Sequence, residues 1–389
     1  MPLLVHSRRS GLCSSPPSQN PLCLSGQNGK IQKHGERERV TNHGLHLVER
    51  KDRNLPASAQ NRWGLVLAGG DGTRLQCLTR VIYGDDRPKQ FCGLLSQETL
   101  LRQTRNRAAR SIPENQTIYA VTEGHRLYFQ EDLAGTSSYK LVQPFNRGTA
   151  PAILLSLFHI AEEQPNALVA ILPCDHYYSN ELSFTAAIES AFETAAQHRD
   201  CVVLLGAHPS GPEVEFGWIV PGPAVSENLF QVQRFEEKPS LCVAEQLLTH
   251  GGLWNTFVMV GSVQTLLNIC FDALPQLAVL ERVRAVANER RELRIATFVY
   301  DNIPTIDFSR HILSPNASRL LVSELNGLDW HDLGQAERVL SVLRSRDAEM
   351  PYWLRQWETA RRPVQRLHHR DPGSIPLRSS LRFEQPPGA

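Results

Sequence analysis

The sequence predicts an α/β fold: a Rossmann-like, doubly wound, mostly parallel sheet. Three observations lead to this prediction. Short apolar or β-branched runs alternate with helical stretches from about residue 62 onward. The 389 residues are 41% hydrophobic and 21% charged, enough for a sizeable core without disulfide staples. No apolar run approaches the roughly 20 residues that span a bilayer, so we expect no membrane partner.

The first half of the fold rests on four apolar runs that are typical of buried strands. They are residues 63–68, 117–122, 168–172 and 201–205. In residues 184–196, apolar side chains recur at i, i+3, i+4 and i+7, which marks one face of a helix. Strands that alternate with helices are joined by right-handed crossovers and therefore run parallel.

The second half, after Gly206, has a different pattern. Its apolar residues alternate as they do in more exposed or antiparallel strands. We expect strands at 216–220, 230–235 and 257–260, a helix at 241–248, and further helices to about residue 292. This half should extend the same sheet and close over a cleft. Ligands of such sheets bind at the carboxyl ends of the strands.

The two ends of the chain differ from the part between them. Residues 1–61 are rich in Ser, Pro, Asn, Gln and Gly and lack periodicity, which predicts a disordered extension. A misassigned start codon would produce the same pattern. Residues 346–389 are expected to form a helical end and a flexible basic tail, and such a tail is usually only solvated. The folded domain is therefore predicted at 62–345.

Charge and cysteine usage limit the partners. The 41 Lys and Arg residues against 40 Asp and Glu residues leave a net charge of +1, so no overall field favours nucleic acid. The eight cysteines form no C-x-x-C pair and no zinc-binding spacing. We interpret them as reduced thiols of a cytoplasmic protein with small-molecule partners.

A glycine-rich segment follows the first strand directly. It reads Leu67-Ala-Gly-Gly-Asp-Gly-Thr-Arg-Leu75, and Arg87-Pro-Lys-Gln90 comes soon after. Glycines bring backbone N–H groups close to a polyanion, while arginine and lysine supply positive charge, which suits a triphosphate. A tight strand-to-helix connection would also need glycine. The segment has neither Walker A nor G-x-G-x-x-G spacing.

These two segments resemble the signature of the sugar-1-phosphate nucleotidyltransferases, and the Gln90-Phe91 ending resembles the mannose-1-phosphate guanylyltransferase branch. Further matches follow in the order typical of the family. They are Asn146-Arg-Gly-Thr-Ala-Pro-Ala-Ile153, Leu172-Pro-Cys-Asp-His176, Phe235-Glu-Glu-Lys-Pro239, Leu253-Trp-Asn-Thr256 and Thr305-Ile-Asp-Phe308. The resemblance covers about residues 63–343. It implies the GT-A-like fold of nucleotide-diphospho-sugar transferases, with a sugar-binding extension.

The resemblance also implies roles for individual residues. The nucleotide would contact Leu67, Ala68, Gly69, Gly70, Gly72, Thr73, Gln143, Thr149 and Ala150. The catalytic residues would be Arg74 and Lys89 on the leaving pyrophosphate, Asp175 on the metal, and Lys238 on the sugar phosphate. Sugar-binding residues would be Gly217, Glu237 and Asn255. His176 would be orienting or structural.

The resemblance implies Mg²⁺ as the cofactor. Its ligands would be Asp175 and Asp307, with Asp332 as a weaker candidate for the second position. Carboxylates are the ligands that Mg²⁺ prefers in proteins. Purely structural explanations remain open: Asp175 as a helix N-cap, Lys238 as an edge charge, Asn255 as a turn residue and Gly217 as a bulge.

The base pocket departs from the guanylyltransferase pattern. Gln143 stands where that branch has Glu, and Asn-Arg-Gly-Thr-Ala-Pro replaces Gly-Arg-Asn-Thr-Ala-Pro. Gln76-Cys77 replaces the usual Trp-Pro. Guanine presents two donors that a carboxylate accepts better than a carboxamide, so UTP or dTTP stays open beside GTP.

The predicted activity is Mg²⁺-dependent attack of a hexose 1-phosphate, mannose 1-phosphate first, on the α-phosphate of an NTP, GTP first. The products would be a nucleotide-sugar such as GDP-mannose and pyrophosphate. Two other classes stay open: a non-catalytic regulator that binds a nucleotide-sugar, and a scaffold that recruits a partner through its basic tail.

Overall fold

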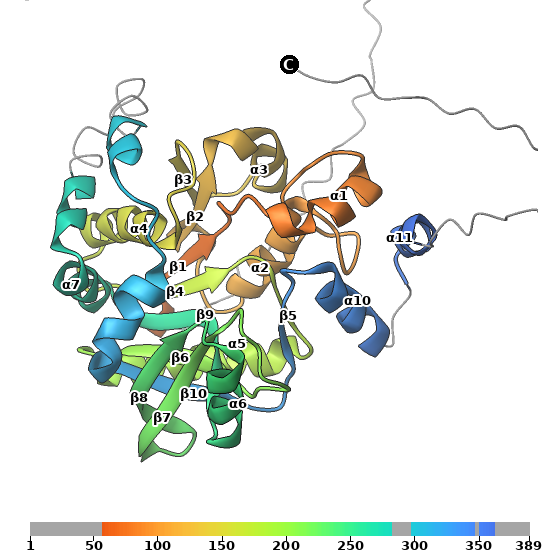
Figure 1. Cartoon of the computed structure of the whole chain (residues 1–389). Coiled ribbons are helices and arrows are strands. Elements are labelled where there is room, and N and C mark those ends of the chain that lie inside the picture. The colour runs from red at the N-terminus through yellow and green to blue at the C-terminus, as the bar shows by residue number, and fades with distance from the viewer. Residues whose placement is uncertain (1–56, 282–296, 347–349, 362–389) are drawn as a thin grey trace, which may run out of the picture. The chain divides into compact units, whose positions relative to one another are not determined.

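A nine-stranded mixed sheet forms the centre of the fold (Figure 1). The computed structural model describes residues 57–281, 297–346 and 350–361, all within the unit Asp52–Ala389. The strand order is β3-β2-β1-β4-β9-β6-β10-β8-β7, and β7 also pairs with β9. The strands are β1 (Arg62–Leu67), β2 (Thr117–Thr122), β3 (Tyr139–Gln143), β4 (Leu168–Pro173), β6 (Val202–Ala207), β7 (Gly217–Ser226), β8 (Leu229–Glu237), β9 (Leu253–Ser262) and β10 (Leu320–Leu325).

The structure confirms the α/β fold class and the change of pattern after Gly206, but the sheet is mixed and not mostly parallel, since four of its strand pairings are parallel and five are antiparallel. Strand β1 pairs parallel with β2 and β4, β2 pairs parallel with β3, and β6 pairs parallel with β10. Strand β9 lies between β4 and β6 and runs antiparallel to both. The β7–β8 hairpin is antiparallel throughout. One strand from the second half is therefore inserted between two strands of the first half.

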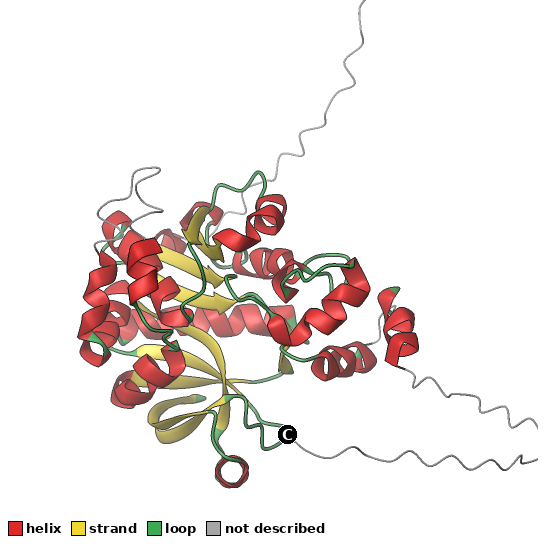
Figure 2. Ribbon diagram, turned by 45° about the horizontal axis from the view of Figure 1, so that its top comes forward, coloured by secondary structure: helices red, strands yellow, loops and turns green. Residues whose placement is uncertain are grey.

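Helices cover both faces of the sheet (Figures 1 and 2). One face packs on α4 (Thr149–Glu163) and α7 (Val263–Ala273), and the other packs on α2 (Leu100–Ala108), α3 (Arg126–Asp132) and α5 (Glu181–Gln197). Successive side chains of β1 pack on opposite faces of the sheet: Leu65 belongs to the first core cluster and Val66 to the second. Both side chains are fully buried, as expected for a strand covered on both sides.

A third apolar cluster lies away from the sheet. It joins α1 (Gln76–Tyr83), which follows the glycine-rich loop, to α10 (Ala336–Ser345) and α11 (Trp353–Arg361). Leu75, Leu333 and Trp353 are fully buried in it. The contact matters for the site, because the helix after the glycine-rich loop is thereby held by the last described part of the chain. Helix α6 (Leu241–Thr249) follows β8.

The expected chain ends are described only in part. Residues 57–61, which the sequence analysis places in the extension, form a 3₁₀-helix whose Gln60 carbonyl accepts from Gln116 and Gln164. The rest of the extension, the expected helices at 282–292 and the tail at 362–389 lie outside the described residues. Among the residues that the structure describes, no helix is long and apolar enough to cross a bilayer.

Two strands and one small sheet were not anticipated. Strand β3 begins with exposed residues, and β10 ends in Ser-Glu-Leu, so neither shows a continuous apolar run. A second sheet pairs β5 (His176–Tyr178) with β11 (Trp330–Asp332). In this pair Asp332 lies opposite His176, which brings the segment after Leu325 to the carboxyl end of β4.

Candidate active site

The glycine-rich loop leaves the carboxyl end of β1 and is shaped by the Arg87-Pro-Lys-Gln90 segment. The Gln90 side-chain amide donates to the carbonyls of Ala68 at 3.0 Å and Gly70 at 2.7 Å. Gly72 has a φ of +62°, and a Cβ there would lie 3.0 Å from the backbone nitrogen of Lys89. Only glycine fits this position without strain. The two sequence motifs therefore form one structural unit.

A cavity of about 370 Å³ opens beside this loop. Eight of the predicted nucleotide-binding and catalytic residues line it: Leu67, Gly69, Gly70, Arg74, Lys89, Gln143, Thr149 and Asp175. His176 and Asp332 line it as well. Four other predicted nucleotide-binding residues belong to the same segments but do not line the cavity: Ala68, Gly72, Thr73 and Ala150. The predicted residues of the sugar end and the second metal ligand do not line it either: Gly217, Glu237, Lys238, Asn255 and Asp307.

Lys89 joins two carboxylates inside this cavity. Its Nζ lies 2.7 Å from Oδ2 of Asp175 and 3.4 Å from Oδ1 of Asp332, and its side chain is 12% exposed. Burial works against the charge of Lys89, but the two carboxylates outweigh it and raise the pKa of the lysine. Burial likewise opposes the charge of Asp175, yet Lys89 lowers its pKa to about 2. Lysine and carboxylate are both charged at neutral pH.

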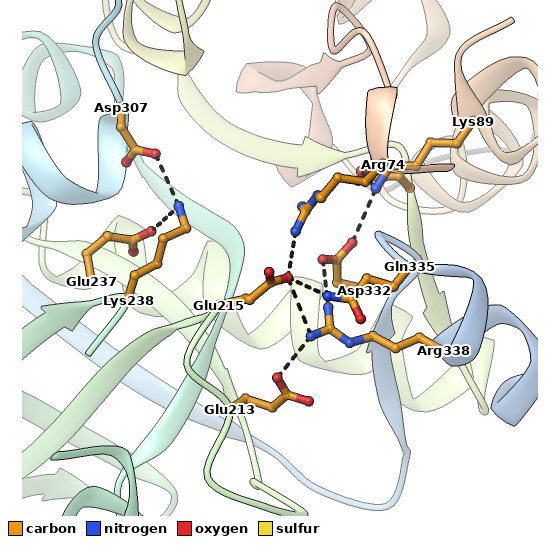
Figure 3. Close-up of polar contacts among 11 residues, drawn as sticks. Arg74, Lys89, Glu213, Glu215, Glu237, Lys238, Asp307, Asp332, Gln335 and Arg338 are labelled. Atoms are coloured by element: carbon orange, nitrogen blue, oxygen red, sulfur yellow. Dashed lines mark hydrogen bonds and ion pairs between the residues drawn. The ribbon is translucent and has the colours of Figure 1, made fainter. Parts of the chain in front are cut away.

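Arg74 belongs to a network that includes residues absent from the predicted set (Figure 3). Its Nη1 lies 2.6 Å from Oε2 of Glu215, in the loop before β7. Gln335 donates to the same oxygen at 2.7 Å. Arg338, on α10, pairs with Glu213 at 3.0 Å and with Asp332 at 3.4 Å. Sequence reasoning missed these four partners, Glu213, Glu215, Gln335 and Arg338, although two of them follow closely after the Trp-His-Asp-Leu-Gly334 segment.

Lys238, Glu237 and Asp307 form a second cluster, on the opposite side of the view in Figure 3. The Nζ of Lys238 lies 3.0 Å from Oε1 of Glu237 and 3.9 Å from Oδ2 of Asp307. Burial raises the pKa of Glu237 even though Lys238 opposes the shift. Lys238 itself has a φ of +52°, an uncommon conformation for a residue other than glycine.

Gly217 makes room for the Glu237 carboxylate, since the two residues pair across β7 and β8. A Cβ at Gly217 would lie 2.6 Å from Oε2 of Glu237. Asn255, on β9, is buried: its side chain accepts from the backbone N–H of Phe257 and donates to Ser309 at 3.4 Å. Phe257 has a φ of +59° and lines the cavity, so the segment that carries Asn255 reaches the cavity wall.

Hydrogen bonds connect the start of α4 with the second cluster. The Thr149 hydroxyl accepts from the N–H of Phe308 at 2.8 Å, and the N–H of Ala150 donates to Ile306 at 3.1 Å. Asp307 lies between these two bonded residues. The start of α4, which lines the cavity through Thr149, therefore holds the segment that presents Asp307 to Lys238.

Gln143 is held in a defined orientation. The Tyr300 hydroxyl donates to its Oε1 at 3.1 Å, and its Nε2 lies 3.0 Å from where a Cβ on Gly69 would be. The amide therefore presents its nitrogen, a hydrogen-bond donor, above the glycine-rich loop.

The predicted metal ligands lie in different clusters, because Asp175 pairs with Lys89 whereas Asp307 pairs with Lys238. Over residues 57–281, 297–346 and 350–361, three or more His, Cys, Asp or Glu side chains never come together as a metal-binding group. Mg²⁺ is often bound by one or two protein carboxylates and substrate phosphates, so Asp175 with either Asp332 or Asp307 still fits its chemistry. His176 is buried against Trp330, and burial lowers its pKa.

Comparison with known proteins places these residues in a family. The family model for nucleotidyl transferases matches residues 63–346. A Vibrio cholerae protein with the provisional name mannose-1-phosphate guanylyltransferase is 33% identical over 209 residues, 52% of this chain and 43% of that protein. The Escherichia coli mannose-1-phosphate guanylyltransferase is 28% identical over 281 residues, 69% of this chain and 57% of that protein. The chain thus spans about half the length of these curated relatives.

A solved structure supports the same relationship. The structure described as mannose-1-phosphate geranyltransferase from Thermus thermophilus is 30% identical, with a TM-score of 0.64, and the match covers 74% of this chain and 80% of that one. A Helicobacter pylori structure described as mannose-6-phosphate isomerase, 21% identical with a TM-score of 0.56, shares the fold. The family model and the Thermus structure together establish that this chain belongs to the nucleotidyl transferase family.

Proposed function

We propose that the protein transfers the nucleotidyl group of an NTP, most favourably GTP, to a hexose 1-phosphate, most favourably mannose 1-phosphate. The observation that carries this proposal is that two groups of ion pairs, each containing lysine, are connected through the start of α4. Arg74 and Lys89 line the cavity, and Lys238 lies outside its lining, beside Asp307, in the segment that Thr149 holds. Two phosphorylated reactants need positive side chains at two such places.

The chemistry requires positioning and charge neutralisation more than a base. An oxygen of the sugar phosphate, already anionic, forms a bond to the α-phosphorus while the bond to the β-phosphate oxygen breaks, and pyrophosphate leaves. Arg74 and Lys89 stabilise the charge that develops on the leaving group, and Lys238 neutralises the attacking phosphate. His176, which burial keeps neutral, supports the neighbouring Asp175 without transferring a proton.

Nucleotidyl transferases generally depend on a divalent metal ion. We propose Mg²⁺ as that ion, held by Asp175 together with Asp307 or Asp332. When bound, it neutralises the phosphate charge. Lys89 pairs with Asp175 and Asp332 and lowers the pKa of Asp175, so Asp175 is charged at the pH where the ion binds.

We assign the binding of the hexose to the second cluster, which contains Glu237 and Lys238. Glu237 and Asn255 offer an acceptor and an amide to hexose hydroxyls, and Gly217 leaves the space that Glu237 occupies. The nucleotide contacts we propose are those of the glycine-rich loop, from Leu67 to Thr73, together with Gln143, Thr149 and Ala150.

A second candidate substrate, UTP or dTTP, has one specific observation in its favour. The Gln143 nitrogen is a donor, which complements a carbonyl oxygen of uracil or thymine, whereas guanine also presents N–H donors that need an acceptor. GTP stays the first choice because the relatives are named guanylyltransferases.

A substrate screen tests the proposal. Purified protein with Mg²⁺ is given each common NTP with mannose 1-phosphate, glucose 1-phosphate or galactose 1-phosphate, and pyrophosphate release is measured. We expect the highest rate with GTP and mannose 1-phosphate. Binding of nucleotide-sugar without release of pyrophosphate from any pair would favour a regulator instead.

We further propose that the protein is cytoplasmic and that its catalytic domain spans residues 62–345.

A further inference from the structure

Arg74 is held by a carboxylate that has a second set of partners. The Arg74 side chain is 56% exposed at the edge of the cavity, and its guanidinium contacts Glu215 at 2.6 Å. The same Glu215 oxygen accepts from Gln335 at 2.7 Å and lies 3.9 Å from Nη2 of Arg338. Glu215 thus lies between a cation of the phosphate-binding loop and two donors close to the start of α10.

Arg338, on α10, is more buried than Arg74 and has more partners of its own. Arg338 is 13% exposed, its guanidinium lies over the ring of Phe216 at 4.4 Å, and it pairs with Glu213 and Asp332. Helix α10 is in turn packed into the third apolar cluster. If Arg74 turns towards another anion, the partly exposed Glu215 carboxylate still accepts from Gln335 at 2.7 Å and has the Arg338 guanidinium at 3.9 Å, so it keeps polar partners of its own.

A polyphosphate is the anion that competes best for Arg74. A guanidinium binds carboxylate and phosphate through the same bidentate geometry, and a polyphosphate carries several charges where Glu215 carries one. In the network of ion pairs that contains Arg74 and Lys89, three cations (Arg74, Lys89 and Arg338) pair with four acids (Glu213, Glu215, Asp175 and Asp332), which leaves a net charge of −1.

We propose that Glu215 is a positioning residue that holds Arg74 until a polyphosphate takes its place, and that Gln335 and Arg338 then retain Glu215. This inference rests on the proposed function. Glu215 lowers the affinity for triphosphate and pyrophosphate, because each must displace it from Arg74. The same competition speeds the departure of pyrophosphate, since Glu215 recaptures Arg74 as the product leaves.

Titration of pyrophosphate in the presence of Mg²⁺ tests the exchange without depending on base or sugar. In Glu215→Gln the side chain keeps its size and loses its charge, and we expect binding about threefold to tenfold tighter than in the unmodified protein. Glu213→Gln is the matched control: it removes a charge from the same loop, but that carboxylate pairs with Arg338, so the affinity should change less than twofold. A thermal melt checks that both variants are folded.

Steady-state kinetics distinguish this exchange from a purely structural role of Glu215, because a structural role would not lower KM and kcat together. Glu215→Gln should lower the KM for the triphosphate and lower kcat about twofold to fivefold through slower product release. In an Arg74→Gln background the same substitution should no longer tighten pyrophosphate binding.

The outcomes separate the two proposals. Equal or weaker pyrophosphate binding by folded Glu215→Gln overturns the exchange and leaves the proposed function standing. Tightening by Glu213→Gln to the same degree also overturns it, because the effect would then be general electrostatics. If the unmodified protein binds neither pyrophosphate nor any NTP, the proposed function fails, and the exchange fails with it.

Discussion

The two ends of the candidate site are organised by different physical means. The end that we assign to the triphosphate, around Arg74, Lys89 and Asp175, is a network of ion pairs between side chains from distant segments. The end that we assign to the sugar, around Glu237 and Lys238, depends more on the backbone. Lys238 and Phe257 both have positive φ there, and Gly217 supplies space that a Cβ would fill.

The difference indicates what each end has to do. A polyphosphate must enter and pyrophosphate must leave, so cations held by exchangeable carboxylates suit the first end. A sugar is distinguished by the placement of its hydroxyls, so side chains fixed by an unusual backbone suit the second. Changes of charge should therefore dominate at the triphosphate end, and changes of shape at the sugar end.

The largest effect is expected from Lys89→Met. Loss of this cation should lower kcat/KM in the pyrophosphate-release assay by about a thousandfold or more. It also leaves Asp175 and Asp332 without their shared partner, and unfolding should become about 2–4 kcal/mol easier in denaturant titrations. Lys140→Met, at an exposed position of β3, is the control and should stay within twofold. Activity losses of similar size in both variants would remove Lys89 from the mechanism.

Replacing Lys238 tests the sugar end. Lys238→Ala should raise the KM for the hexose 1-phosphate by about ten- to a hundredfold and leave pyrophosphate affinity unchanged. Lys238→Gly should lose the same activity but be about 0.5–1 kcal/mol more stable than Lys238→Ala, because glycine adopts positive φ without strain. Equal stability of the two variants would show that the backbone strain at this residue has no energetic weight.

A smaller effect is expected from Gly217→Ala, which changes shape without charge. The added methyl must displace the Glu237 carboxylate, and the KM for the sugar phosphate should rise about tenfold. Gly211→Ala, in the loop before β7, is a control because its Cβ would meet nothing within 4 Å. An unchanged KM in Gly217→Ala would mean that Glu237 does not bind the sugar.

The smallest effect is a difference in acid sensitivity. Burial raises the pKa of Glu237, so this carboxylate is protonated first as the pH falls, and sugar affinity should weaken first. The pKa of Asp175 is lowered to about 2, so the stability it contributes is present above the ordinary pKa of about 3.9 and is lost only as the pH falls towards 2. KM values for each substrate between pH 4.5 and 7 check the order. Simultaneous weakening of both would contradict it.

Much of the fold could be predicted from local sequence because buried parallel strands are continuous apolar runs. Strand β2 (Thr117–Thr122) was expected with the bounds it has. Strands β3 and β10 escaped prediction because their apolar residues are interrupted, and the insertion of β9 between β4 and β6 depends on long-range pairing.

The site was predictable where a residue lies inside a recognisable motif. Lys89 and Asp175 come from separate motifs and are in contact, as one shared site requires. Glu215 begins the Glu-Phe-Gly-Trp segment that supplies Gly217, but its contact with Arg74 spans 141 positions of the chain, so only the folded structure brings the two together. The pairing of Asp332 with Lys89 likewise depends on the β5–β11 sheet, which the sequence pattern does not predict.

The path of the phosphorus atoms tests the central claim most directly, namely that one site joins two phosphorylated reactants. The purified protein is given mannose 1-phosphate, Mg²⁺ and GTP labelled either at the α- or at the γ-phosphate. The account predicts that the α-label appears in GDP-mannose and the γ-label in pyrophosphate, in equal amounts. Release of γ-label as inorganic phosphate, or of α-label in free GMP or GDP, with no labelled GDP-mannose, would contradict it.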